Sequence, residues 1–161
     1  MDFVLPMMDV PLADYVSAAV LADRLGFHSI AFADHVVTPK AVASTYPSTS
    51  DGKMPWDERK SYPDPWVTAA AMAAVTHSLR FMSAIYILPM RHPVLAAHAV
   101  ATAAVFTGNR VIMGVGVGWM REEFAALGSD FSNRGRRADE AIDLMRKLWA
   151  GGYVQRDGTY Y

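Results

Sequence analysis

The pair Asp34-His35 is the part of the sequence best suited to chemistry near neutral pH. A histidine imidazole can give or take a proton in this range, and a neighbouring carboxylate can raise its basicity or fix its orientation. The pair directly follows residues 29–33, a continuous apolar run that predicts a buried strand. We predict a functional role for both residues. The alternative is that Asp34 only caps the strand end and that His35 is a satisfied loop histidine.

A second candidate site is the glycine run at residues 114–118, which reads Gly-Val-Gly-Val-Gly and is followed by Trp119. Its spacing does not match the G-x-G-x-x-G dinucleotide fingerprint, whichever glycine is taken first. A strand end without side chains lets a flat ligand or a phosphate approach the backbone. The alternatives are a tight turn without a ligand and, for Trp119, either a place over a ligand or packing of a short helix.

The remaining titratable residues give weaker signals. Glu122 and Glu123 are predicted to lie on a short helix, where a solvated acidic face would account for at least one of them. His92 precedes a proline and is interpreted as a helix N-cap. The other histidines are predicted to be structural: His28, His77 and His98. The sequence contains no cluster with metal-ligand spacing, no nucleophile elbow and no P-loop, so we expect no metal site.

Four apolar runs alternate with Ala-rich helical patterns along the chain. The predicted strands cover residues 3–6, 29–33, 80–88 and 110–113. The predicted helices cover residues 10–25, 64–77, 92–107, 119–127 and 132–149, with proline in the first turn of the first three. On the last helix the predicted apolar face comprises Ala138, Ile142, Met145, Leu148 and Trp149. Continuous apolar strands that alternate with helices indicate an α/β fold with a parallel sheet.

Of the two common α/β architectures, we predict a TIM-type (β/α)8 barrel rather than a doubly wound sheet. Asp34-His35 and the glycine run both follow strand ends, which is where the active sites of such barrels lie. A whole barrel takes about 250 residues, whereas this chain has 161 and about four βα units. We therefore interpret residues 1–161 as the N-terminal half of a barrel. Residues 151–161 are predicted to form a small hairpin that turns at Asp157-Gly158.

The connection at residues 36–63 is far longer than the usual βα link of about two to six residues. It carries Tyr46, Trp56 and Tyr62 together with four prolines. A long aromatic loop after a barrel strand is interpreted as a lid or as a wall of a substrate site. The alternative is a poorly ordered insertion.

Composition excludes several classes of function. The 15 basic and 16 acidic residues leave a net charge of -1, which offers no electrostatic footprint for nucleic acid or an anionic membrane. The absence of cysteine excludes disulfides and thiolate chemistry and fits a reducing compartment. Neither a signal-peptide pattern nor an apolar run of roughly 18 residues occurs. We expect a cytoplasmic protein that acts on a small-molecule substrate.

The sequence resembles the luciferase-like monooxygenase family, and within it the branch that uses the deazaflavin coenzyme F420. The matching motifs are GFHS leading to FADH at residues 26–35, LPMRHP at 88–93, GVGVGW followed by EEF at 114–124, and RRADE leading to LW at 136–149. Each motif alone is weak. Their order and spacing across nearly the whole chain are specific.

The resemblance implies a TIM barrel whose cofactor ring lies at the C-terminal mouth. His35 would stand near the ring as an acid/base or electrostatic partner, and Asp34 would help to hold the cofactor. Family members often carry a non-proline cis peptide at the end of the third strand, which matches about Ser83-Ala84 here. This peptide would press against the ring.

The glycine run would border the cofactor through Gly116, Val117 and Gly118, and we count Trp119 with these cofactor-binding residues. Some sugar-phosphate dehydrogenases of the family have an acid at the position of Trp119. This departure argues against their particular substrate and proton donor.

The activity that the resemblance implies is hydride transfer between F420, or a reduced flavin, and a small organic substrate. One alternative is an FMN-dependent monooxygenase that uses oxygen. A second is a truncated, non-catalytic family member that acts as a dimerising or structural subunit, and a third, weaker one is a metal-dependent hydrolase or isomerase. Unpaired edge strands favour association, so the expected partners are a second copy of the chain or a complementary C-terminal half.

Overall fold

The computed structural model describes residues 1–57 and 59–161. The chain forms two compact units. The first comprises residues 1–34, 62–86 and 97–115, and the second comprises residues 35–61, 87–96 and 116–161. Within the described ranges, no helix combines the length and the apolar character that crossing a membrane requires.

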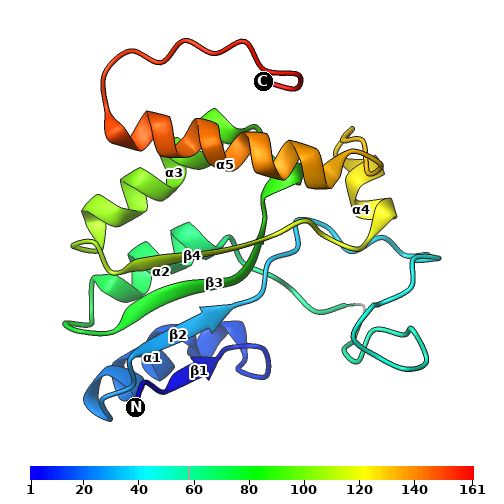
Figure 1. The fold of residues 1–161 in the computed structure, drawn as a ribbon. Coiled ribbons are helices and arrows are strands. Elements are labelled where there is room, and N and C mark those ends of the chain that lie inside the picture. The colour runs from blue at the N-terminus through cyan, green and yellow to red at the C-terminus, as the bar shows by residue number, and fades with distance from the viewer. Residues whose placement is uncertain (58) are drawn as a thin grey trace. The chain divides into compact units, whose positions relative to one another are not determined.

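A parallel sheet of four strands lies mainly in the first unit. The strands are β1 (Val4–Pro6), β2 (Ser29–Phe32), β3 (Arg80–Ile87) and β4 (Val111–Gly116). Each strand pairs with the one that precedes it in the sequence, and Ile30 is the partner of both Leu5 and Phe81 (Figure 1). This sequential order is that of a βα barrel and differs from the 3-2-1-4 order of a doubly wound sheet.

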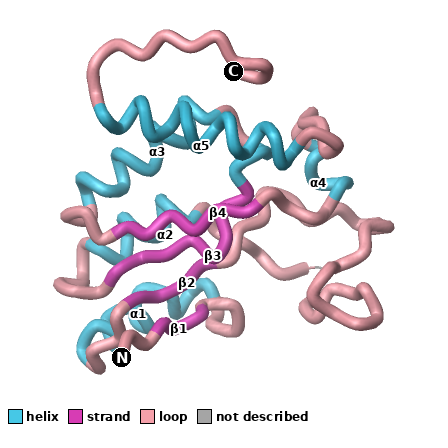
Figure 2. Tube along the Cα trace, viewed as in Figure 1, coloured by secondary structure: helices cyan, strands magenta, loops and turns pink. Residues whose placement is uncertain are grey.

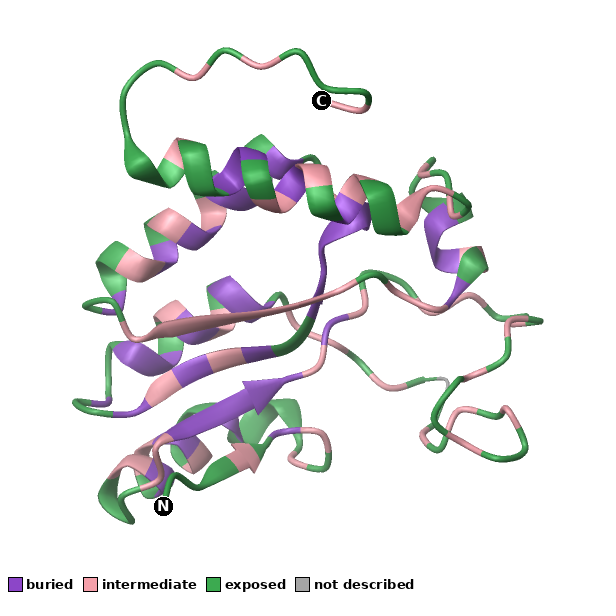
Figure 3. Ribbon diagram, in the orientation of Figure 1, coloured by how far each residue is buried: buried purple, intermediate pink, exposed green. Residues whose placement is uncertain are grey.

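The core of the first unit is built on β2, which is buried at every position (Figure 3). Helices α1 (Tyr15–Arg24) and α2 (Pro65–Ala73) contribute the other large share. The buried cluster consists of Met7, Tyr15, Ala19, Ala22, Ile30, Phe32, Ala69, Met72, Ala73, Leu79 and Phe81. The small side chains of the two helices let their backbones lie close to the sheet.

Local capping signals place two helix starts correctly. The Asp64 carboxylate accepts hydrogen bonds from the N–H groups of Trp66 and Val67, at 2.9 and 3.0 Å. Helix α2 begins at Pro65, directly after this N-cap. Helix α3 (Pro93–Phe106) also begins at a proline, and the backbone N–H of Val94 donates to His92 Nδ1 at 3.3 Å. The interpretation of His92 as an N-cap is confirmed.

The start of the first helix is predicted too early. Pro11 precedes a short 3-10 turn, η1 (Leu12–Asp14), and α1 begins only at Tyr15. The Tyr15 hydroxyl donates to the carbonyl oxygen of Met7 at 3.1 Å, which ties the beginning of the helix to the segment after β1.

The second unit contains η2 (Leu88–Met90), α4 (Arg121–Ala126), α5 (Arg134–Ala150) and the long connection. Figure 2 shows no helix or strand in the described part of residues 36–63. The core of the second unit is a cluster of Ile87, Met90 and Phe124, with Phe131 packed against it. The buried residues of α5 are Ala138, Ala141, Leu144 and Met145. The predicted apolar face of α5 is therefore only partly correct.

The predicted C-terminal hairpin is wrong. Residues 151–161 contain no strand, and a side chain of α5 occupies the hydrogen-bond donors that a hairpin would use. The Glu140 carboxylate accepts from the backbone N–H groups of Thr159, Tyr160 and Tyr161. Although burial alone would raise the pKa of Glu140, these hydrogen bonds hold it below its ordinary value. A charge-assisted clasp replaces the strand pairing.

Candidate active site

His35 and Glu123 form a hydrogen-bonded pair in the second unit. His35 Nδ1 lies 2.9 Å from Glu123 Oε2, and the side chain of Glu123 is only 1% exposed. The other carboxylate oxygen accepts from the backbone N–H groups of Val36 and Val37, at 2.6 and 3.3 Å. Because a carboxylate can only accept, His35 carries a proton on Nδ1, and the neutral ring has its lone pair on Nε2.

Sequence reasoning did not give Glu123 this role. Its position on the short helix did contain a signal, because its neighbours Met120 and Phe124 are apolar and are 2% and 1% exposed. A carboxylate on the buried face of a helix needs a partner, and here the partners are the imidazole and two backbone N–H groups.

Three aromatic side chains form a cluster beside His35. The ring of His35 lies 6.1 Å from that of Trp56 and 6.4 Å from that of Trp119, measured between centroids. Tyr46 meets both indoles edge-on, at 5.0 and 5.1 Å. The long connection thus supplies two members of the cluster. Trp119 contacts His35 and Tyr46, so its role extends beyond packing of α4.

Glu122, the neighbour of Glu123, holds a second part of the long connection. Its Oε1 accepts from the backbone N–H groups of Ala43 and Ser44, at 2.8 and 3.0 Å. The Ser44 hydroxyl donates to Oε2 at 2.7 Å and accepts from the N–H of Arg121 at 3.0 Å. The prediction of a solvated acidic face does not hold for Glu123, which is buried, whereas Glu122 is half-buried and is held by its hydrogen bonds to the loop. Both carboxylates fix the base of the loop.

Acid is expected to release this loop. Burial alone would raise the pKa of Glu122, but the hydrogen bonds from Ser44 and Ala43 lower it below the ordinary value of 4.5. The stabilisation from Glu122 is therefore complete above pH 4.5 and is lost as the pH falls through the lowered pKa. We expect tryptophan fluorescence to change in this acid range, before far-UV circular dichroism reports loss of helix.

The matched variants for this titration are Ser44→Ala and Ser48→Ala. Ser44→Ala removes the side-chain donor, so the fluorescence midpoint is expected to move to higher pH. Ser48 is exposed, and its replacement should leave the midpoint unchanged. Equal midpoints for the two variants would contradict the assignment to Glu122.

Packing within the chain explains two members of the glycine run. Gly118 has a φ of +77°, and a Cβ there would lie 2.7 Å from Ile87 Cγ2 and 2.8 Å from Phe124 Cε2. A Cβ on Gly114 would overlap the carbonyl oxygen of Ser83. The alternative that needs no ligand is therefore sufficient for these two positions.

The predicted cofactor residues are divided between the two units. Asp34, Ser83 and Ala84 belong to the first, whereas His35 and residues 116–119 belong to the second. Asp34 and Ser83 are both buried, at 4% and 0% exposure. The Ser83 hydroxyl donates to the carbonyl oxygen of Gly114 at 3.0 Å.

The third strand does contain a non-proline cis peptide. It joins Ala84 to Ile85, one bond further along the chain than the expected Ser83-Ala84. The resemblance to the family therefore predicts the position of this cis peptide to within one residue.

Comparison with known proteins now identifies the family. Residues 5–161 match the family model of the luciferase-like monooxygenases. The chain belongs to this family. This luciferase-like chain is 35% identical over 147 residues to an uncharacterized protein of Mycobacterium tuberculosis. The aligned region is 91% of this chain and 51% of that protein.

A relative with a named activity is the F420-dependent glucose-6-phosphate dehydrogenase of Beutenbergia cavernae. The two are 34% identical over 152 residues, which is 92% of this luciferase-like chain and 40% of the dehydrogenase. The chain therefore spans about half, or less, of the length of these curated relatives.

A solved structure agrees with the fold. The oxygenating constituent of 3,6-diketocamphane monooxygenase from Pseudomonas putida, in complex with FMN, matches the whole chain with a TM-score of 0.77 at 20% identity. The chain covers 43% of that structure. At this identity the likeness concerns the fold alone, and it confirms the prediction of half a TIM barrel.

The residues of the second unit fit a flat flavin-type ring in their chemistry. They offer the planar faces of two tryptophans and a tyrosine, a histidine whose tautomer is fixed, and a partly exposed strand end at Gly116 and Val117. Aromatic and apolar walls with a few placed polar groups are typical of cofactor sites.

Proposed function

We propose that this chain is part of an oxidoreductase that transfers a hydride between F420 and a small organic substrate. The observation that carries the proposal is the His35–Glu123 pair at 2.9 Å, with an aromatic cluster beside His35. Membership of the luciferase-like family supports the reaction class. The name of the Beutenbergia relative supports F420 as the cofactor.

In this proposal the cofactor supplies two-electron hydride chemistry when bound. Within the second unit, Gly116, Val117, Gly118 and Trp119 are the proposed contacts. Backbone groups would approach the ring where side chains are small, and Trp119 would offer a planar face. Asp34, Ser83 and Ala84 of the first unit stay proposed contacts on the family resemblance.

His35 is the proposed catalytic residue. Its Nδ1 proton is engaged by Glu123, so the proton that the reaction moves would be taken and returned at Nε2. Glu123 acts through His35 and is a positioning residue. The aromatic side chains of the long connection would exclude water from the reacting atoms.

The proposed substrate differs from a sugar phosphate. Trp119 stands at the position where some sugar-phosphate dehydrogenases of the family have an acid. An indole cannot donate the proton that such a carboxylic acid would supply. The substrate named for the Beutenbergia relative therefore does not carry over to this chain.

Cofactor titration tests the proposal. We expect F420 fluorescence to change saturably when the purified chain is added. His35→Asn is expected to weaken this binding about tenfold, which is the effect of losing one hydrogen bond. His98→Asn is the matched control, because His98 is an exposed residue of α3. A folded chain that binds no F420, or equal affinities for the two variants, would contradict the proposal.

An FMN-dependent monooxygenase is the second candidate. Its support is the structure of the Pseudomonas putida monooxygenase, which shares the fold and was solved in complex with FMN. A parallel titration separates the two candidates, since saturable binding of FMN in place of F420 would favour the monooxygenase.

We further propose that the chain associates with a second copy of itself or with a complementary C-terminal half. Strands β1 and β4 are the two ends of the described sheet, and such edges offer unpaired backbone groups. Apolar side chains are exposed on the helices, among them Leu21, Val105 and Phe106 at 55%, 80% and 75%. Light scattering on the titration samples measures the mass, and a monomeric chain would contradict self-association.

A further inference from the structure

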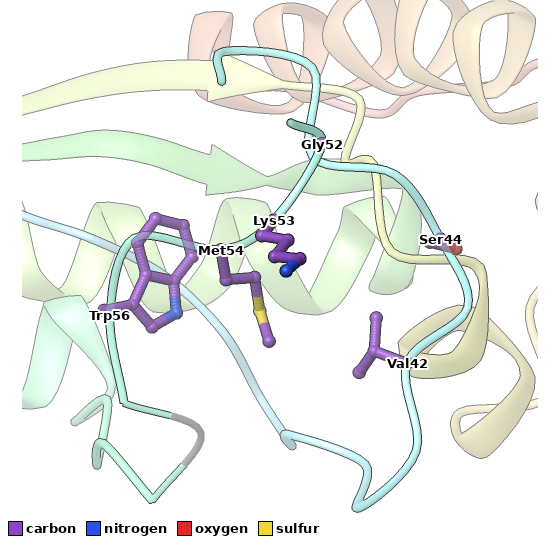
Figure 4. A pocket seen from close by; sticks show the side chains of 6 residues that line it. All are labelled: Val42, Ser44, Gly52, Lys53, Met54 and Trp56. Atoms are coloured by element: carbon purple, nitrogen blue, oxygen red, sulfur yellow. The ribbon is translucent and has the colours of Figure 1, made fainter. Parts of the chain in front are cut away.

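A pocket of about 300 Å³ lies entirely within the long connection of the second unit. Two stretches of the loop form its walls, one at residues 42–44 and the other at residues 52–56 (Figure 4). The lining residues are Val42, Ser44, Gly52, Lys53, Met54 and Trp56. A volume near 300 Å³ is at the lower end for ligand sites and suits a molecule of about ten non-hydrogen atoms.

Hydrogen bonds, some to α4 and some within the loop, hold both walls of the pocket in place. The first wall is tied to Glu122 through Ser44. In the second, the Gly52 carbonyl oxygen accepts from the N–H of Tyr46 at 2.7 Å, and the Thr49 hydroxyl donates to the carbonyl oxygen of Lys53 at 2.8 Å. Gly52 has a φ of +71°, and a Cβ there would overlap the methyl group of Thr45. These contacts give this part of the loop a defined turn conformation.

The lining combines three apolar side chains with one cationic group. Val42, Met54 and Trp56 provide a hydrocarbon, a thioether and an indole surface. Ser44 is the other polar side chain, and its hydroxyl is already bonded to Glu122 and Arg121. Figure 4 shows the side chains of Lys53 and Met54 directed into the space between the two stretches. Within the described ranges, the Lys53 ammonium makes no hydrogen bond or ion pair.

We propose that this pocket binds a small amphipathic anion, a carboxylate joined to a flat or aliphatic apolar group. The ammonium of Lys53 would pair with the carboxylate, and the surfaces of Met54, Trp56 and Val42 would cover the apolar group. A neutral ligand would gain no attraction from the exposed Lys53 ammonium, and a purely polar anion would gain no contact from the indole and thioether surfaces.

Trp56 connects this pocket with His35. The same indole lines the pocket and lies 6.1 Å from the imidazole between ring centroids. An occupant of the pocket would thus contact a ring that contacts the proposed catalytic histidine. That the bound anion is the substrate, or part of it, rests on the proposed function. The binding itself does not.

The test uses the whole chain without cofactor and two probes of nearly equal shape, 3-phenylpropionate and its neutral amide. Isothermal titration calorimetry is expected to show saturable binding of the carboxylate, at least about fivefold tighter than binding of the amide. Two-dimensional NMR should show shifts of the Trp56 indole and Met54 methyl signals. Absence of saturable carboxylate binding, or equal affinities for the two probes, would overturn the proposal.

Two lysine variants locate the cation. Lys53→Met keeps the length of the side chain and removes the charge, so the preference for the carboxylate is expected to disappear. Lys40→Met is the matched control, since Lys40 is an exposed lysine of the same connection outside the lining set. A preference that survives in Lys53→Met would also overturn the proposal. If the unmodified chain binds the probe but does not bind F420, the proposed function alone is contradicted.

Discussion

Replacing Glu123 with alanine is expected to lower the free energy of unfolding by about 3 kcal/mol. The change removes the acceptor of one imidazole N–H and two backbone N–H groups. Each donor that stays buried without an acceptor costs about 1–3 kcal/mol, and some of the three would gain water when the loop relaxes. Equilibrium urea denaturation, followed by circular dichroism, measures the loss as a lower midpoint.

Two further carboxylate variants make this measurement specific. Asp143→Ala removes an exposed carboxylate from α5 and should change the midpoint very little. Glu123→Gln keeps the shape and one acceptor, and because the N–H groups of Val36 and Val37 need that oxygen, the N–H₂ group is placed against His35. We expect a smaller loss of stability and a shift of the His35 tautomer, visible in the ¹⁵N chemical shifts of its ring. An unchanged tautomer would contradict the positioning role of Glu123.

Replacing Gly118 with alanine is expected to cost about 3 kcal/mol of folding free energy. Two separate penalties add up. A φ of +77° disfavours any residue with a Cβ by about 1 kcal/mol, and the added methyl would press on Ile87 and Phe124 at 2.7 and 2.8 Å. Phe124 is 1% exposed, so it has little room to move. The same urea denaturation reports the effect.

Two other glycines separate these penalties. Gly128 has a φ of +66° but no atom within 4 Å of a built Cβ, so Gly128→Ala should show the backbone cost alone, about 1 kcal/mol. Gly135 lies in α5 with open space around it, and Gly135→Ala should stabilise the chain by about 0.5 kcal/mol. If Gly118→Ala cost no more than Gly128→Ala, packing against Phe124 would not be the reason for the glycine.

Local signals in the sequence predicted much of the fold. The starts of α2 and α3 follow from an N-cap residue that is directly followed by a proline, and the apolar run that became β2 is buried throughout. Such features depend on neighbours in the chain. The barrel prediction rested on Asp34-His35 and the glycine run, which both follow strand ends, and the sequential order of the four strands agrees with it.

The candidate site could be predicted only in part, because its contacts join distant segments. His35 was identified from its place after a strand, but its partner Glu123 lies 88 residues away, and no local pattern pairs them. The same holds for the tail. A turn signal at Asp157-Gly158 is local, whereas the clasp by Glu140 depends on how the tail returns to α5. One carboxylate outweighed the turn propensity.

The two adjacent glutamates of α4 also bear on how this protein can change. Because they fix residues 36–37 and 43–44 through backbone N–H groups, with Ser44 adding its hydroxyl, the attachment of the loop does not depend on the side chains beyond residue 44. The stretch from residue 45 onward, with the pocket wall at 52–56, can then be exchanged or lengthened without redesigning its anchor. Doubling a flexible loop costs only about 0.6 kcal/mol. The wall at 52–56 can thereby change ligand preference while residues 42–44 keep the anchor, which makes that wall a suitable target for engineering new specificity.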